Sequence, residues 1–349
     1  MPWDTIGHER ALAVLRRAAE DEARLSHAYL FVGPERVGRA TAARSFAQAL
    51  NCVRQDSAAG PPCGECRPCR LIAEDKHPDV EWMAPGGLCD ESDHRDHEGS
   101  RDIRICQVRR LERVVSRSPF EARYRVVVVD PADALTVEAA NAFLKTLEEP
   151  PAQVILVLIT AHEEMLRETV RSRCRRIAFG GVPRQAIEDA LRERWGAPSE
   201  QAERLAHLAQ GRLGWAVAAL QDERLLIDRE RVLDAVVSVS GGGVVDRFAY
   251  ASELGGRLAR DPASVFDALD VWQDWWRDVL LAAAGSEEPA TDGRVDTRQA
   301  HAAQYGVAGA LQALRAVTNV RQQLDEHASP TLALEVMVLD LPAGRAGDR

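Results

Sequence analysis

Three continuous apolar runs, separated by segments with helical periodicity, constrain the fold of this chain most strongly. They lie within the segments 28–32, 125–130 and 154–160, and in the second segment the run consists of four consecutive valines. Apolar runs of this length without polar interruption suit strands that are buried on both faces, as in a parallel sheet. Residues 177–179 would add a last short strand. Strands that alternate with helices predict an α/β fold built on a parallel sheet.

The expected helices divide the chain into three parts. In the first part, apolar positions recur at helical spacing over residues 6–20, 39–51, 105–117 and 136–148. The strand signal ends near residue 180, and 349 residues exceed the size of one ordinary domain. We therefore expect a sheet-containing domain over residues 1–180, a small helical domain over 181–222 and a larger all-helical domain over 223–349.

The composition is that of a globular protein with an acidic surface. The net charge is −10, and 46% of the residues are hydrophobic. Such a chain is not expected to bind nucleic acid through a broad basic face. The first residues lack the basic start and apolar run of a signal peptide, and no stretch approaches the roughly 20 apolar residues that span a bilayer. We therefore expect a cytoplasmic protein without a membrane partner.

Four of the seven cysteines are closely spaced in the chain: Cys52, Cys63, Cys66 and Cys69. The last three form two consecutive C-x-x-C steps, a spacing typical of a tetrahedral zinc site. Since thiolates would fill all four positions, the zinc would be structural and not catalytic. Free or disulfide-bonded cysteines and an iron–sulfur cluster are the alternatives. His94 and His97 lie in an acidic insertion over residues 86–101, which is expected to be a solvated loop.

The segment from Gly33 to Thr41 follows an expected strand and precedes an expected helix, as a phosphate-binding P-loop does. A working P-loop supplies a lysine to the outer phosphates and a hydroxyl to magnesium. Here Gly33 and Gly38 keep the frame, but Arg39 and Ala40 stand at the lysine and hydroxyl positions. Thr41 comes one position too late. The competing interpretation is a strand-to-helix turn that binds no ligand.

Asp130 ends the expected strand at 125–130, where a P-loop ATPase carries the aspartate that faces magnesium. An enzyme of this type usually has a glutamate next, which polarises the attacking water, but Pro131 stands there. Asp133 follows two residues later and is not expected to replace that glutamate. Alternatively, Asp130 simply caps a strand or turn.

Further motifs make the chain resemble the clamp-loader branch of the AAA+ family. They are the segment 141–151 (NAFLKTLEEPP), Thr160 at the end of its strand, and Ser172-Arg173-Cys174. The opening Ile6-Gly7, the segment 26–31, the four-cysteine insertion and the segment 330–335 fit as well, so the resemblance covers nearly the whole chain. It implies an AAA+ P-loop domain with a zinc module, a helical lid domain, and a helical collar that packs with its equivalents in a pentameric ring.

The resemblance also separates two kinds of subunit within this branch. The motor subunits (gamma/tau) keep the lysine, the threonine, the Walker B glutamate and a sensor 2 arginine, at the positions held here by Arg39, Ala40, Pro131 and Gly214. The combined loss implies a non-catalytic subunit of the DNA polymerase III holoenzyme, without intrinsic ATPase and with doubtful ATP binding. Its degenerate nucleotide site would comprise Gly33, Gly38, Arg39, Thr41, Asp130 and Thr160. An active gamma/tau motor is the alternative.

For Arg173 the resemblance implies an arginine finger that reaches into the ATP site of a neighbouring motor subunit. A guanidinium there stabilises the charge that develops on the transferred phosphoryl group. The implied partners are gamma/tau and delta subunits and, through the complex, the sliding clamp and primed DNA. A surface ion pair is the alternative for Arg173. A stand-alone zinc-containing DNA-binding protein is a second alternative for the whole chain, disfavoured because the sequence has no basic stripe.

Overall fold

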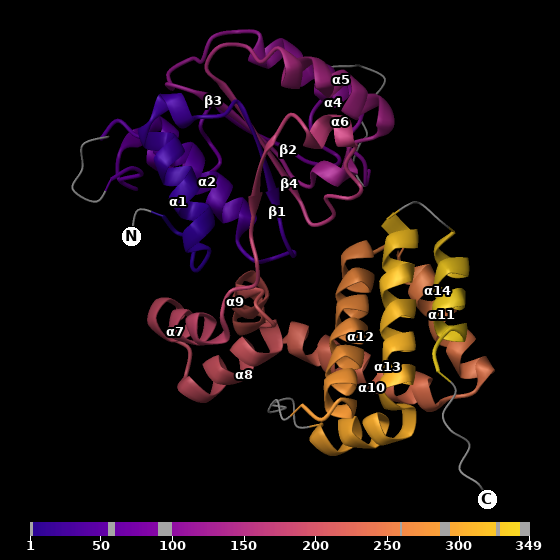
Figure 1. The fold of residues 1–349 in the computed structure, drawn as a ribbon. Coiled ribbons are helices and arrows are strands. Elements are labelled where there is room, and N and C mark those ends of the chain that lie inside the picture. Colours follow the sequence, from indigo (N-terminus) through magenta and orange to yellow (C-terminus); the bar gives the residue numbers. More distant parts are fainter. Residues whose placement is uncertain are drawn as a thin grey trace, which may run out of the picture. The chain divides into compact units, whose positions relative to one another are not determined.

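The structure of the chain, a computed structural model, describes residues 3–54, 60–89, 100–258, 260–286, 294–325 and 329–342. The chain forms two compact units, Met1–Val217 and Ala218–Arg349 (Figure 1). None of the helices that the structure describes is both long enough and apolar enough to cross a membrane.

A five-stranded sheet forms the centre of the first unit (Figure 1). Its strands are β1 (Ala28–Val32), β2 (Val80–Met83), β3 (Arg125–Val129), β4 (Val154–Thr160) and β5 (Arg175–Ala178). The spatial order is β2-β3-β4-β1-β5, and all neighbouring strands are parallel. The predicted parallel α/β sheet is therefore confirmed.

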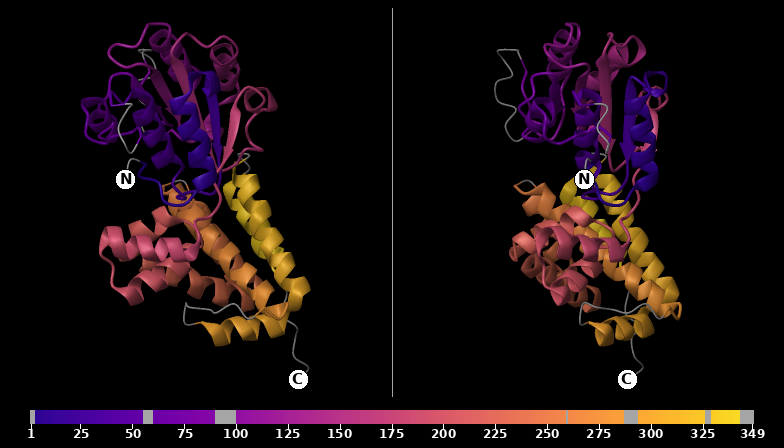
Figure 2. Two further views of the ribbon diagram at one scale, coloured as in Figure 1. Left: turned by 60° about the vertical axis from the view of Figure 1, so that its left-hand side comes forward. Right: turned by 90° about the vertical axis from the view of Figure 1, so that its left-hand side faces the viewer.

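Helices cover both faces of this sheet (Figure 2). They are α1 (Glu9–Glu20), α2 (Arg39–Asn51), α3 (Arg67–Ala73), α4 (Ile105–Val115), α5 (Val137–Glu148) and α6 (Glu168–Arg171), with short 3₁₀ turns η1 (Glu22–Arg24) and η3 (Ala132–Ala134). Alternate residues of β1 face opposite layers: Phe31 packs in a core with α1 and α2, and Leu30 packs in a core with α4 and α5. The carboxyl ends of the strands thus meet loops that lead into helices.

The apolar runs predict the central strands better than the edges. Residues 28–32 and 154–160 form β1 and β4 with the expected bounds, and β3 ends one residue before the expected 130. β5 begins at Arg175, two residues before the expected strand at 177. The apolar pattern does not include these first two residues, because they are arginines that are exposed at the sheet edge. β2 was not expected from the sequence, since this four-residue edge strand is mostly half-buried and contains no continuous apolar run.

The first unit continues into helices that lie beyond the sheet. These are α7 (Arg184–Trp195), α8 (Ser199–Ala209) and the beginning of α9 (Leu213–Gln221), within which the two units meet in the chain. α7 and α8 pack against each other, with Leu191 and Leu205 fully buried. The helical character predicted after residue 180 is therefore confirmed.

The second unit is entirely helical in the part that the structure describes. Its helices are α10 (Arg224–Gly241), α11 (Val244–Leu258), α12 (Pro262–Ala283), α13 (Val295–Asp325) and α14 (Pro330–Leu339). Trp272, Trp275 and Trp276 of α12 are almost fully buried in one core with α13 and α14. α13 is interrupted at Gly306, whose backbone is not helical (φ 61°, ψ −175°).

Arg247 of α11 binds the C-terminal ends of two other helices in this unit, α10 and α14. Arg247 of α11 is buried, and its guanidinium donates four hydrogen bonds of 3.0–3.2 Å to backbone carbonyls, those of Ser240, Val338, Leu341 and Pro342. The Tyr305 hydroxyl donates a fifth bond to the Ser240 carbonyl at 3.0 Å. Carbonyls at helix C-termini lack partners within their own helix, so the cationic side chain satisfies groups that burial would otherwise leave unpaired.

Candidate functional site

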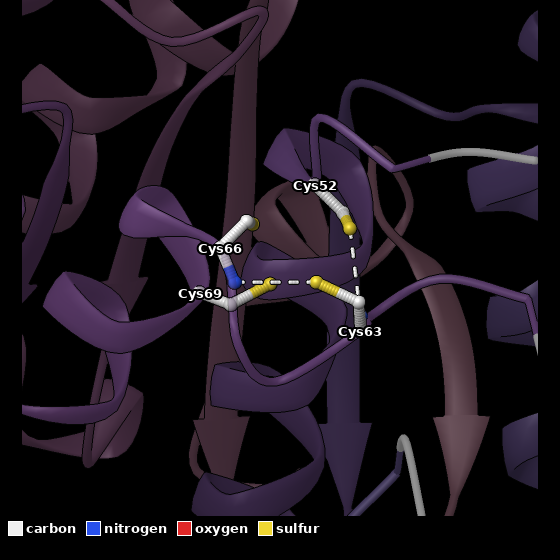
Figure 3. A group of neighbouring side chains, drawn as sticks. All are labelled: Cys52, Cys63, Cys66 and Cys69. Atoms are coloured by element: carbon white, nitrogen blue, oxygen red, sulfur yellow. Dashed lines mark hydrogen bonds between the residues drawn. The ribbon is translucent and has the colours of Figure 1, made fainter. Parts of the chain in front are cut away.

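The four clustered cysteines converge on one point (Figure 3). Cys52 directly follows α2, Cys63 lies in the next loop, Cys66 precedes α3 and Cys69 lies within α3. Their sulfur atoms all lie within 4.8 Å of one another. Zinc–sulfur bonds of about 2.3 Å in a tetrahedron place the sulfurs roughly 3.8 Å apart, so this cluster is able to hold a metal ion such as zinc after a small contraction.

Hydrogen bonds to backbone groups hold the cluster in place. The Cys63 N–H donates to Cys52 Sγ at 3.4 Å, and the Cys66 N–H donates to Cys63 Sγ at 3.3 Å (Figure 3). Gln48 of α2 donates from Nε2 to the Cys69 carbonyl at 2.7 Å. Burial alone would raise the pKa of the Cys63 thiol, but N–H groups that point at its sulfur lower that pKa to about 7. One ligand is thus close to the thiolate form that metals require.

The other cysteines lie apart from the cluster, as expected from the sequence. Cys106 is buried in α4, and burial raises the pKa of Cys174 to about 12. A thiol with such a pKa is unreactive near neutral pH. His94 and His97 lie outside the described residues, as does most of the acidic insertion.

The P-loop-like turn depends on both of its glycines. The Gly33 N–H donates to the Thr160 carbonyl at 3.3 Å, and a Cβ atom at Gly33 would lie only 2.0 Å from the Phe179 carbonyl oxygen. Gly38 precedes α2 with φ 114°, a conformation that favours glycine. The structure therefore brings the ends of β1, β4 and β5 together at this turn.

Arg39 points its charge into the protein. It is only 8% exposed, and its Nη1 atom has no hydrogen-bond partner among the described residues. Burial lowers the pKa of Arg39, while the nearby carboxylates of Asp130, Glu35 and Asp133 oppose that shift. Conversely, burial raises the pKa of Asp130, and the Arg39 charge opposes it. The predicted P-loop and Walker B residues are thus close enough for their charges to interact.

Of the remaining predicted nucleotide-site residues, Thr160 contacts other protein groups. The Thr160 hydroxyl donates to Asp133 Oδ1 and accepts the His162 N–H at 2.9 Å. Thr41 is half-buried in the first turn of α2. The hydroxyl proton of Thr160 is therefore already donated to Asp133 within the protein.

Two contacts on the P-loop-like turn were not expected from the sequence. The Gly214 N–H, at the start of α9, donates to the Arg36 carbonyl at 2.7 Å, and a Cβ atom at Gly214 would lie 2.8 Å from that oxygen. His8 Nε2 lies 2.9 Å from the Val37 carbonyl oxygen. The sequence marks Gly214 only as a missing arginine, and no pattern identifies His8, because both contacts depend on tertiary packing.

Arg173 lies between α6 and β5 with its side chain 34% exposed. Its Nη1 donates to the Thr169 carbonyl at 2.8 Å, and its Nη2 donates to Glu148 Oε1 at 2.5 Å. Glu148 is the last residue of α5. Sequence reasoning did not single out Glu148, although it lies within the 141–151 motif.

Comparisons with known proteins agree with the resemblance found in the sequence. The model of a family described as "DNA polymerase III, delta subunit" matches residues 7–182. The chain is 27% identical over 336 residues to DNA polymerase III subunit delta' of Bacillus subtilis, a match that covers 96% of each chain. It is 38% identical over 149 residues to subunit delta' of Pseudomonas aeruginosa, covering 43% of this chain and 42% of that protein. It is also 31% identical over 238 residues to subunit tau of B. subtilis, covering 68% of this chain and 38% of tau.

Proposed function

The chain belongs to the DNA polymerase III delta-subunit family, and we propose that it acts as the delta prime subunit of a cytoplasmic replicative clamp loader. In this role it is a non-catalytic stator in a pentameric ring with gamma/tau and delta subunits, and the ring loads the sliding clamp onto primed DNA. The match to the B. subtilis delta' protein along 96% of both chains supports this role over that of tau, of which the chain spans 38%.

The buried charge of Arg39 is the observation that carries this proposal. In a magnesium-dependent ATPase the Walker B aspartate faces the metal ion. Here Arg39 stands at the position of the P-loop lysine, and its bulkier guanidinium is buried near the carboxyl group of Asp130 and not presented to a ligand. Ala40 offers no oxygen to the metal, and Pro131 offers no base to the attacking water. Magnesium-dependent hydrolysis therefore lacks three of its parts.

The contact at Gly214 supports the same conclusion. The family resemblance places the sensor 2 arginine of motor subunits at this position. A side chain at Gly214 would collide with the Arg36 carbonyl oxygen, at 2.8 Å from the first added atom. A motor subunit with this backbone would have to move the start of α9 away from the turn. In this chain the start of α9 packs directly against the P-loop-like turn, through the contact between Gly214 and the Arg36 carbonyl.

We assign a structural zinc ion to Cys52, Cys63, Cys66 and Cys69. Four convergent sulfurs leave no open coordination position for a substrate. The ion would join the end of α2 to α3, two elements that the Gln48 hydrogen bond already connects. This module would stabilise the fold of the first unit without a part in ATP hydrolysis.

Arg173 is the group that we assign to catalysis in trans. Its guanidinium is partly exposed, and the residue lies in the segment between α6 and the edge strand β5. An arginine needs such exposure to reach the phosphates of a neighbouring subunit. Arginine fingers contribute about 10³–10⁵ in rate in other phosphoryl-transfer enzymes. The second unit would supply the helical collar that joins the ring.

Reconstitution tests the proposal. The isolated protein is expected to show no magnesium-dependent ATPase, and a complex with gamma/tau and delta is expected to hydrolyse ATP when primed DNA is present. Arg173→Ala should lower that activity at least tenfold and leave assembly intact. Arg184→Ala, which removes an exposed arginine of α7, is the matched control.

Two results would support the alternatives. ATPase activity of the isolated protein that Arg39→Ala abolishes would indicate a motor subunit. Tight, salt-sensitive binding of the isolated protein to primed DNA would indicate a DNA-binding protein that acts alone.

A further inference from the structure

We propose that Glu148 is a positioning residue for Arg173. Its carboxylate holds the guanidinium so that the remaining N–H groups face the nucleotide phosphates of a neighbouring subunit. This inference rests on the proposed role of Arg173 as an arginine finger, and it adds a second residue, from the end of α5, to that function.

The hydrogen bonds of Arg173 leave part of the guanidinium available. The group has five N–H donors in a planar fork. Within the described part of the chain, one donor of Nη1 is used by the Thr169 carbonyl and one donor of Nη2 by Glu148 Oε1. Three donors remain for phosphate oxygens. The two acceptors fix the plane of the guanidinium, because they bind different nitrogen atoms.

The backbone that carries Glu148 is held firmly. The preceding residue, Leu147, is buried, and its carbonyl lies 3.0 Å from His27 Nε2. The following residue, Glu149, donates its N–H to the Lys145 carbonyl at 3.0 Å. Pro150 and Pro151 come next and have restricted φ angles. The carboxylate of Glu148 is thus presented from a fixed point on the first unit.

A carboxylate at this position is unfavourable for the helix itself. Glu148 ends α5, where the unpaired carbonyls create a partial negative charge that favours cations over anions. The cation that compensates it is Arg173, which comes from the segment after α6. Because the two side chains are 34% and 49% exposed, the ion pair adds little to the stability of the chain. We therefore infer that the main effect of the ion pair is to orient the Arg173 guanidinium.

Orientation matters because arginine is long and flexible. A free arginine side chain samples many rotamers, and all but the productive one are lost when it binds phosphate. A guanidinium already fixed by two acceptors loses less freedom on reaching the neighbouring site. Fixed geometry acts mainly on the transition state, so it should raise kcat with little effect on the KM for ATP.

The test uses the reconstituted complex with its DNA-stimulated ATPase. Glu148→Gln, which keeps the size of the side chain and removes its charge, is expected to lower kcat about 3- to 10-fold with KM changed less than twofold. Glu148→Asp, which keeps the charge, should recover part of the rate. Glu149→Gln is the matched control, because it removes the adjacent charge at the same helix end. Gel filtration of each variant complex checks assembly.

Combined variants separate this inference from the function on which it rests. When Arg173 is alanine, adding Glu148→Gln should change kcat no further, since Glu148 acts through the guanidinium. An equal loss with and without Arg173 would overturn the positioning role, and so would an unchanged or increased rate in Glu148→Gln alone. A complex in which Arg173→Ala has no effect would instead refute the arginine finger itself.

Discussion

Asp79 anchors the loop between α4 and β3, and its replacement by asparagine is a sensitive test of the fold. The carboxylate is fully buried just before β2 and accepts three backbone N–H bonds of 2.7–3.0 Å, from Phe120, Glu121 and Ala122. It also accepts a 2.8 Å bond from Arg125 Nη2, and Arg125 is itself buried at the start of β3. Asp79→Asn removes the charge and turns an N–H donor toward some of these donors.

The size of the effect follows from the pKa of Asp79. Burial raises that pKa, but the N–H bonds and the Arg125 guanidinium outweigh burial and lower it from 3.8 to about 2. At 1.36 kcal/mol per pH unit, the shift corresponds to about 2.5 kcal/mol of stability. Asparagine also leaves the buried Arg125 charge unpaired, and breaking a buried pair costs about 3–5 kcal/mol. We therefore expect Asp79→Asn to lower the free energy of unfolding of the first unit by about 3–5 kcal/mol at pH 7.

The pH dependence has a defined sign. Because the folded-state pKa is lowered, the contribution of Asp79 is complete above about pH 4 and is lost as the pH falls through 2. The difference between the wild type and Asp79→Asn should therefore narrow by about 1 kcal/mol between pH 7 and pH 3. Urea unfolding at both pH values measures this difference in stability. Hydrogen exchange of residues 118–126 shows whether the destabilised segment is the loop that Asp79 binds.

A matched control distinguishes the anchor from a general loss of acidic charge. Asp75 pairs with Arg44 at 2.9 Å, but its side chain is 49% exposed. Asp75→Asn should cost about 1 kcal/mol or less. Equal effects of the two substitutions, or unchanged exchange of the Phe120, Glu121 and Ala122 amides in Asp79→Asn, would refute this account of the loop.

Three further predictions concern other parts of the structure. Protein purified without chelator should contain one zinc ion per chain by elemental analysis, and Cys69→Ser should remove most of it; a zinc-free wild type would reject the metal site. Gly214→Ala should destabilise the first unit by about 1–3 kcal/mol through its collision with the Arg36 carbonyl, whereas Gly256→Ala in α11, where an added Cβ meets no atom within 4 Å, should leave the melting temperature unchanged or higher. Arg247→Met should destabilise the second unit by about 2–4 kcal/mol in urea unfolding, because the buried carbonyls of Val338, Leu341 and Pro342 lose their side-chain donor, whereas the Ser240 carbonyl keeps the Tyr305 hydroxyl; a loss below 1 kcal/mol would show that other groups satisfy them.

The sequence predicts those parts of the fold in which local pattern and burial agree. β1 and β4 are buried at every position, so each appears as an uninterrupted apolar run with clear ends. α2 is predicted with its observed bounds because Gly38 precedes it and its apolar residues recur at helical spacing. β2 has neither signal, since it lies at the sheet edge and only Met83 is fully buried. Edge strands depend on tertiary contacts more than on their own composition.

The same distinction between local pattern and tertiary contact separates the predicted from the unpredicted residues of the candidate site. Cysteine spacing predicts a cluster because consecutive C-x-x-C steps restrict where the sulfurs point, and the structure brings the four together. The contact between Gly214 and the Arg36 carbonyl joins residues far apart in the chain and depends on how α9 packs, which no local pattern records. Glu148 was overlooked because a glutamate at a helix end has an ordinary appearance until Arg173 is placed beside it.

The bonds made by Arg247 also bear on the order in which the second unit folds during synthesis. Three of its four acceptors, the carbonyls of Val338, Leu341 and Pro342, are translated about ninety residues after the arginine itself. Until those residues have left the ribosome, the guanidinium has one of its native acceptors, the Ser240 carbonyl, and the core around α12 lacks its last helix. Helices α10 to α13 therefore remain an incomplete assembly until then, and the second unit reaches its final packing only after Pro342 has left the ribosome.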